Sequence, residues 1–174
     1  MSKTVMGIHY MIIYKDLDTL RKFYSPFTKT QIIENNEAVL LNPFYETVDA
    51  VRHFLYDDMQ MNVFGLERDK LLVIIDALES YFGPEPDREF KEKMANRVKE
   101  LGKKGLSIMN DTGAYPYKGM YKELVDYELS LPTVFDNPLK RFCIFHEKDF
   151  DRLSKNQKTK LIDHHGMTIK IDKE

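Results

Sequence analysis

Residues 8–27 read IHYMIIYKDLDTLRKFYSPF. The apolar run Ile8–Tyr14 at its start predicts a strand buried on both faces, which is typical of an inner strand of a parallel sheet. Apolar residues then recur every three or four positions, which predicts a helix capped by Asp16 or Asp18. They are Leu17, Leu20, Phe23 and Phe27. Pro26 is expected to end or kink this helix, because proline removes a backbone donor.

Short apolar runs and helical stretches continue to alternate along the chain. This order predicts a three-layer α/β domain with a mostly parallel sheet flanked by helices. No linker or internal repeat interrupts the pattern, so we expect residues 1–174 to form one domain. Further strands are expected at Glu37–Leu41, Met59–Phe64, Leu71–Ile75, Leu106–Met109, Arg141–Phe145 and Thr168–Ile171. Further helices are expected at Thr47–Tyr56, 87–101, Met120–Leu131, Asp149–Leu153 and Lys155–His165.

Composition excludes several classes of protein. The chain has 174 residues, a net charge of -2 and one cysteine. A single cysteine rules out an internal disulfide framework. The near-neutral charge argues against a general nucleic-acid binder, which needs a basic surface. Neither a signal peptide nor an apolar run of membrane-spanning length is visible, so we expect a cytoplasmic protein with no membrane partner.

Polar and aromatic residues follow the predicted strands. Ligands bind beyond the carboxyl ends of strands in parallel sheets, and this rule selects five segments. They are Tyr14–Asp18, Asn42–Tyr45, Asp76–Tyr81, Asn110–Tyr117 and His146–Asp149. From them we predict a ligand-binding set consisting of Tyr14, Asp76, Asp111, Tyr115 and His146. The alternative, that these residues are loops and helix caps, stays open because Asp and Asn favour such places.

The usual catalytic patterns are absent from the sequence. The first strand runs into Lys15–Thr19 instead of a glycine-rich phosphate loop, and no GxGxxG occurs. The segment Leu72–Asp76 does resemble an apolar strand ending in a magnesium-binding Asp. No serine stands in a G-x-S-x-G turn, and Cys143 lies within a predicted strand, where a cysteine is usually inert. We therefore predict no catalytic residue and no cofactor.

Histidines give little indication of a metal site. His164 and His165 are adjacent, and neighbours on a helix point in different directions. His9 and His146 belong to different strands, and neither has a partner at the short spacing common in zinc sites. The sequence therefore predicts no metal.

The order of these pieces resembles the MEDS family, the methanogen/methylotroph sensory domain that also occurs in the dichloromethane-responsive repressor. The resemblance rests on 7–14 (GIHYMIIY), 37–41 (EAVLL) and 105–111 (GLSIMND). It continues through Tyr127-Glu128, the strand 141–145 (RFCIF), Phe150 with Leu153, and a terminal histidine at 164 or 165. It covers the chain from about Gly7 to Ile171. The motif positions carried over are His9, Tyr14, Glu128 and Cys143.

The resemblance implies a RecA-like or KaiC-like core without a phosphate-binding loop. It also implies a non-enzymatic role in signal transduction, with a small apolar ligand or a protein signalling partner. Two alternatives remain: a degenerate RecA-like nucleotide-binding ATPase that uses Asp76, and an oligomeric interaction protein. A homodimer is left open.

Overall fold

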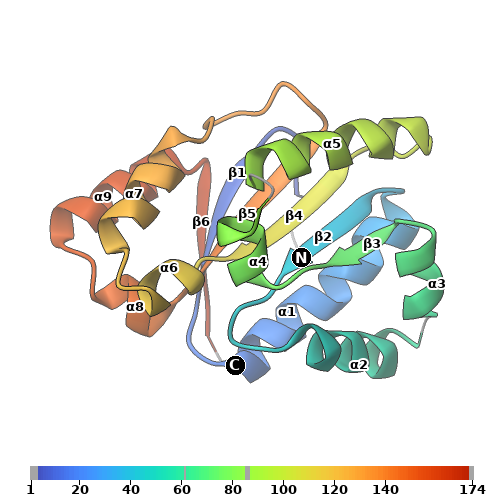
Figure 1. Cartoon of the computed structure of the whole chain (residues 1–174), viewed down its shortest axis with the longest axis horizontal. Helices are drawn as coiled ribbons and strands as arrows, with labels where there is room; N and C mark the ends of the chain where they lie inside the picture. The colour runs from blue at the N-terminus through green and yellow to red at the C-terminus, as the bar shows by residue number, and fades with distance from the viewer. Residues whose placement is uncertain (1–3, 61, 85–86, 173–174) are drawn as a thin grey trace.

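Six parallel strands form one sheet at the centre of the molecule (Figure 1). The computed structural model describes residues 4–60, 62–84 and 87–172. The order of the strands across the sheet is β3-β2-β4-β5-β1-β6. Their bounds are β1 His9–Tyr14, β2 Ala38–Asn42, β3 Leu72–Ile74, β4 Leu106–Asp111, β5 Leu139–His146 and β6 Met167–Ile171. The predicted parallel α/β fold is thereby confirmed.

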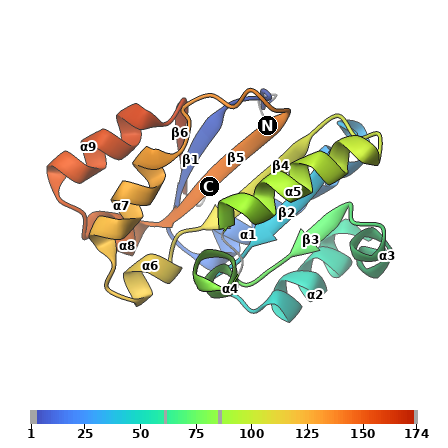
Figure 2. The same ribbon diagram turned by 45° about the horizontal axis from the view of Figure 1, so that its top comes forward.

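Helices cover both faces of the sheet and complete three layers (Figures 1 and 2). One face carries α1 (Leu17–Lys29), α2 (Val48–Met59) and α3 (Val63–Arg68). The other face carries α4 (Ala77–Phe82), α5 (Asp87–Glu100), α6 (Ala114–Tyr117), α7 (Tyr121–Ser130), α8 (Glu147–Asp151) and α9 (Lys155–His164). In Figure 2, α7 and α9 lie side by side next to β6 and β1, and α5 runs along β2 and β4.

The central strands are buried on both faces because apolar side chains point alternately to each helical layer. Along β1, Tyr10 and Ile12 pack against the α1–α2 layer, whereas Met11 and Ile13 pack against the layer of α7 and α9. All six residues of β1 are buried. Full burial of one large apolar side chain is worth about 1.5–3 kcal/mol, so this double coverage stabilises the sheet strongly.

A buried ion pair links Lys140 on β5 to Glu37, the residue that precedes β2. Lys140 Nζ lies 2.8 Å from Glu37 Oε1, and both side chains are nearly inaccessible. Lys140 also donates to Gln31 Oε1 at 2.7 Å, and the Ser107 hydroxyl donates to Glu37 Oε2 at 2.7 Å. The surrounding hydrogen bonds satisfy the two charges, as burial of an ion pair requires.

Three local predictions differ from the structure. The strand expected at Met59–Phe64 does not form; α3 begins at Val63, where the Asn62 side chain accepts a hydrogen bond from Gly65 N at 2.9 Å. Met61 lies outside the described residues. Helices α4 and α6 also form, although the sequence pattern predicts no helix in either segment.

Pro26 does not end α1, which runs to Lys29 and continues as a π-helical turn, Thr30–Glu34. The ring is exposed, while the neighbouring Phe27 and then Ile32 are buried in the core and hold this segment against the sheet. Tertiary packing thus outweighs the donor that proline removes.

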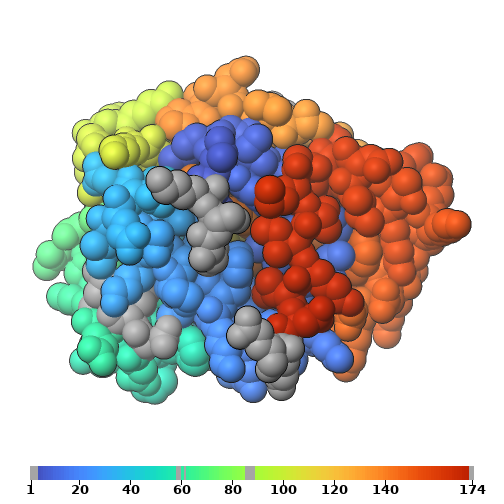
Figure 3. Space-filling view, turned by 180° about the vertical axis from the view of Figure 1, so that it is seen from behind, coloured from blue at the N-terminus to red at the C-terminus, as the bar shows by residue number. Residues whose placement is uncertain are grey.

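Strand β6 forms one edge of the sheet, and its residues are exposed or half-buried. Figure 3 shows this C-terminal segment in red beside the blue N-terminal part of the chain. In the described part of the chain, no helix has both the length and the apolar composition that crossing a membrane would require.

Candidate functional site

Three of the five predicted ligand-binding residues meet at the carboxyl edge of the sheet. The Tyr14 hydroxyl, at the end of β1, donates to Asp111 Oδ2, at the end of β4, over 3.0 Å. The ring of His146, which ends β5, lies edge-on to the Tyr14 ring with centroids 5.0 Å apart. Parallel register brings these residues together, since Tyr14 is aligned with His146 and Asp111 with Ile144.

Burial changes the acid-base properties of this group. Burial raises the pKa of Asp111 from 3.8 to about 7, although hydrogen bonds from Gly113 N and the Tyr14 hydroxyl partly oppose the rise. Burial, with the Asp111 charge, also raises the pKa of Tyr14 far above its ordinary value, so this phenol stays protonated. Near pH 7, therefore, Asp111 exchanges a proton while Tyr14 remains a hydrogen-bond donor.

Tyr45 and Asp149 extend the group, although the predicted ligand-binding set of five residues does not include them. The Tyr45 hydroxyl donates to the Asp149 carboxylate, and the Tyr45 ring lies 5.1 Å from that of His146. His146 in turn caps α8, because its Nδ1 accepts a hydrogen bond from Lys148 N at 3.1 Å. Both missed residues belong to the segments that follow β2 and β5, so the strand-end rule located the segments but not these side chains.

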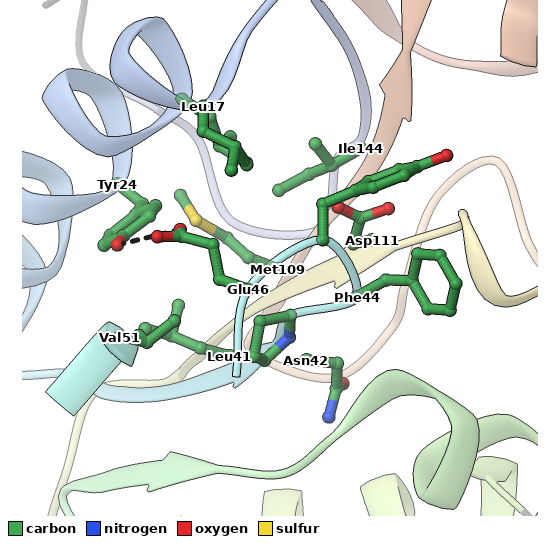
Figure 4. A pocket seen from close by; sticks show the side chains of 13 residues that line it. Leu17, Tyr24, Leu41, Asn42, Phe44, Glu46, Val51, Met109, Asp111 and Ile144 are labelled. Atoms are coloured by element: carbon green, nitrogen blue, oxygen red, sulfur yellow. Dashed lines mark hydrogen bonds between the residues drawn. The ribbon is translucent and has the colours of Figure 1, made fainter. Parts of the chain in front are cut away.

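A small cavity of about 30 Å³ lies between this edge and helix α1, which is room for one or two water-sized molecules. Figure 4 shows Leu17, Met109 and Ile144 around it, with Asp111 on one side and Glu46 on another. The Tyr24 hydroxyl donates to Glu46 Oε2 at 3.2 Å, and Arg21 Nε donates to Glu46 Oε1 at 2.6 Å. The other lining residues are Leu20, Tyr24, Leu41, Asn42, Pro43, Phe44, Tyr45 and Val51.

Asp76 and Tyr115 do not join this group. Asp76 caps α4, where Oδ1 accepts hydrogen bonds from Leu78 N at 2.8 Å and Glu79 N at 3.3 Å. Tyr115 lies in the layer of α4–α9 and packs its ring against Tyr81, with centroids 4.9 Å apart. The capping interpretation left open by the sequence therefore describes what the Asp76 side chain does in the fold.

The turn after β1 is built around a side chain rather than around glycines. The Asp16 side chain caps α1 by accepting from Thr19 N at 3.0 Å and from the Thr19 hydroxyl at 2.9 Å. Of the two caps that the sequence allows, Asp16 and Asp18, the structure therefore has Asp16. The backbone donors at this helix terminus are thus partly used by a carboxylate, whereas a phosphate loop keeps them for its ligand.

Three of the four carried-over motif positions lie together in the other layer. His9, Glu128 and Cys143 gather with His165, and all four side chains are buried. Burial lowers the pKa of His9 and raises that of the Cys143 thiol. Burial alone would raise the pKa of Glu128, but the attraction of the neighbouring His165 and His9 side chains brings it well below the usual range. Tyr14, the fourth motif position, stands apart at the carboxyl edge.

We compared the chain with known proteins. No protein-family model and no curated protein sequence matches it. Among solved structures, it resembles the KaiC-like protein PH0186 from the hyperthermophilic archaeon Pyrococcus horikoshii OT3, with a TM-score of 0.63 at 12% identity. The match covers 95% of this chain and 72% of that one. This chain has a KaiC-like, RecA-type α/β fold. At this identity, the likeness establishes the fold alone.

Proposed function

We propose that this protein is a non-enzymatic sensory domain that binds a small, largely apolar molecule at the carboxyl edge of its sheet. The observation that carries the proposal is the buried hydrogen bond between Tyr14 and Asp111 beside an apolar cavity. Ligands of open parallel sheets bind at this edge. A few placed polar groups in an apolar wall are the usual make-up of a small-molecule site.

The chemistry of the cavity favours a neutral ligand. Leu17, Met109 and Ile144 supply an apolar wall, and the carboxyls of Asp111 and Glu46 are its acidic groups. A carboxyl whose pKa is about 7 can accept or donate a hydrogen bond at neutral pH, whereas an anion would meet acidic groups. The smallest alcohols, aldehydes, ketones and halogenated methanes come nearest to these requirements of size and polarity.

Contacts at the same edge connect the ligand cavity to the protein surface, so that ligand binding could change the surface structure. Tyr45 lines the cavity, is 40% exposed, and donates to Asp149 on α8. His146, beside the Tyr45 ring, caps the same helix. A ligand that displaces Tyr45 from this arrangement would therefore change the start of α8, where a protein signalling partner could detect it.

A binding screen tests the proposal. Thermal shift and isothermal titration would be run on the full chain with the four neutral ligand classes above, and with phosphate and acetate for comparison. Leu17→Phe places a larger side chain at the cavity wall and should abolish binding. Ile162→Phe makes a comparable change from an aliphatic side chain to phenylalanine at an exposed position of α9 and should leave binding intact. The proposal fails if none of the neutral ligands binds, or if Leu17→Phe binds as tightly as the wild type.

The KaiC-like fold favours one alternative, a nucleotide-hydrolysing enzyme that uses Asp76. Its test is magnesium-dependent ATP turnover by the wild type and by Asp76→Ala. We expect no turnover, because the Asp76 carboxylate caps α4 and a side chain caps the turn after β1. Turnover that disappears in Asp76→Ala would replace the sensory proposal with this alternative.

A further inference from the structure

Four metal-ligating side chains converge inside the layer opposite the proposed ligand cavity. They come from separate elements: His9 begins β1, Glu128 lies on α7, Cys143 lies within β5, and His165 follows α9. His9 and Cys143 point to the same face of the sheet, toward the layer of α7 and α9, and the four ligand atoms lie within 4.8 Å of one another. We propose that these residues form a four-ligand site for a borderline-soft divalent cation of the Zn²⁺ type.

Three distances within the cluster are close to those around a tetrahedral ion. His9 Nε2 lies 3.1 Å from Cys143 Sγ and 3.6 Å from Glu128 Oε2. His165 Nε2 lies 3.5 Å from the same carboxylate oxygen. Zinc bonds of the usual lengths at tetrahedral angles place neighbouring ligand atoms about 3.4–3.6 Å apart. Three of the contacts are therefore within about half an ångström of the spacing that a tetrahedral ion requires.

The hydrogen bond of His165 leaves a lone pair facing the centre of the cluster. Its Nδ1 lies 2.6 Å from the Leu161 carbonyl oxygen, which can only accept, so Nδ1 carries the proton. In the neutral imidazole, Nε2 is then an acceptor, yet it faces a carboxylate oxygen that is also an acceptor. A positive charge between them resolves this conflict. A ligating histidine commonly donates its other ring N–H to a backbone carbonyl, a carboxylate or water, which orients the ring.

Buried polar atoms without hydrogen-bond partners support the same assignment. Among the described residues, Glu128 Oε1 and Oε2 and His165 Nε2 are buried and make no hydrogen bond. Native structures leave few such groups, because an unsatisfied buried polar atom costs about 1–3 kcal/mol. A cation bound between them would satisfy the Glu128 carboxylate and His165 Nε2 together.

The ligand types select the class of ion. One thiolate, two imidazoles and one carboxylate form a mixed soft and hard set that suits Zn²⁺, whereas Ca²⁺ and Mg²⁺ prefer oxygen ligands. Four protein ligands, all buried, leave no open position for water or substrate, which is typical of a structural site rather than a catalytic one. The ion would therefore cross-link α7 and the end of α9 to strands β1 and β5.

Metal loading tests this proposal independently of ligand binding at the carboxyl edge. Because the site is closed, the full chain would be unfolded with a chelator present and refolded with Zn²⁺ or Co²⁺ after the chelator is removed. We expect one metal ion per chain after gel filtration. The Co²⁺ form should show a near-ultraviolet thiolate-to-cobalt charge-transfer band and intense visible bands of tetrahedral coordination.

Variants identify the ligands. Cys143→Ser should remove the charge-transfer band, and both it and Glu128→Gln should weaken Zn²⁺ binding by at least about 100-fold. Cys143→Ala serves as a second thiol-free variant, and circular dichroism verifies that each variant folds. His53→Ala, which removes an exposed histidine on α2, should bind like the wild type. Absence of stoichiometric metal in the refolded wild type would overturn the proposal, as would an unchanged cobalt spectrum in either thiol-free variant.

Discussion

Replacing Asp111 by asparagine should make the protein more stable above pH 7 and abolish one part of its pH dependence. In the folded protein the pKa of Asp111 is raised to about 7, against 3.8 for an ordinary aspartate. Between these two pH values the unfolded chain releases a proton that the folded chain retains. Stability therefore falls as the pH rises through this window, and it levels off above about pH 7.

The size of the effect follows from the same two pKa values. Each pKa unit corresponds to about 1.4 kcal/mol, so the contribution lost between pH 4 and pH 8 is about 4 kcal/mol. Asparagine has the same shape and keeps the hydrogen bonds: its oxygen accepts from Gly113 N, and its amide donates to the Tyr14 hydroxyl, which otherwise donates to the carboxylate. The variant thus removes the charge and keeps both contacts, with donor and acceptor exchanged in the contact to Tyr14.

Urea denaturation of wild type and Asp111→Asn at pH 4, 5, 6, 7 and 8 measures this contribution. Other carboxylates titrate in the same range, but they are common to both proteins and cancel in the difference between the two free energies of unfolding. The variant should match the wild type near pH 4 and exceed it by up to about 4 kcal/mol at pH 8. A difference that stays constant across the pH range would refute the raised pKa of Asp111.

Three further substitutions test other parts of the fold by the same denaturation assay. Tyr14→Phe removes the hydroxyl that donates to the buried carboxylate, and it should cost about 1–3 kcal/mol, more at pH 8 than at pH 5; an equal loss at both would contradict the assigned hydrogen bond. Glu37→Gln leaves the Lys140 charge buried without its counter-ion, which should cost about 3–5 kcal/mol, and the double variant Glu37→Gln/Lys140→Met should regain part of that loss. Asp16→Ala should cost about 1 kcal/mol as the loss of a helix cap, whereas Asp18→Ala should change stability by less than about 0.5 kcal/mol; the reverse order would mean that the cap is misassigned.

The fold could be predicted because its strands are buried on both faces and therefore stand out as apolar runs. The predicted Ile8–Tyr14 exceeds β1 by one residue, and the predicted Arg141–Phe145 lies within the longer β5. The prediction was wrong at Met59–Phe64. Apolar residues at every second position favoured a strand there, but the Asn62 side chain caps a helix. A local hydrogen bond from the backbone to the Asn62 side chain favours the helix, and the pattern of apolar residues carries no information about such a bond.

Side-chain clusters proved harder to predict than strands. The strand-end rule located Tyr14, Asp111 and His146 because the ends of parallel strands share one edge of the sheet. It could not show that Asp76 serves as a helix cap, because capping and ligand-binding carboxylates occur in similar sequences. His9 and His165 are more than 150 positions apart in the sequence. They meet because β1 and β6 are neighbours, which no local spacing reveals.

Strands β1 and β5 connect the two proposed sites but present them to different layers. His9 and Tyr14 lie five positions apart on β1, and an odd separation places their side chains on opposite faces. The same holds for Cys143 and His146 on β5. The two sites should therefore respond independently: Asp111→Asn should leave the Zn²⁺ stoichiometry unchanged, and Cys143→Ser should leave ligand affinity at the carboxyl edge unchanged. A change of more than tenfold in the binding affinity of the other site, caused by either substitution, would mean that the two layers are coupled through these strands. The metal would then regulate ligand binding rather than only stabilise the fold.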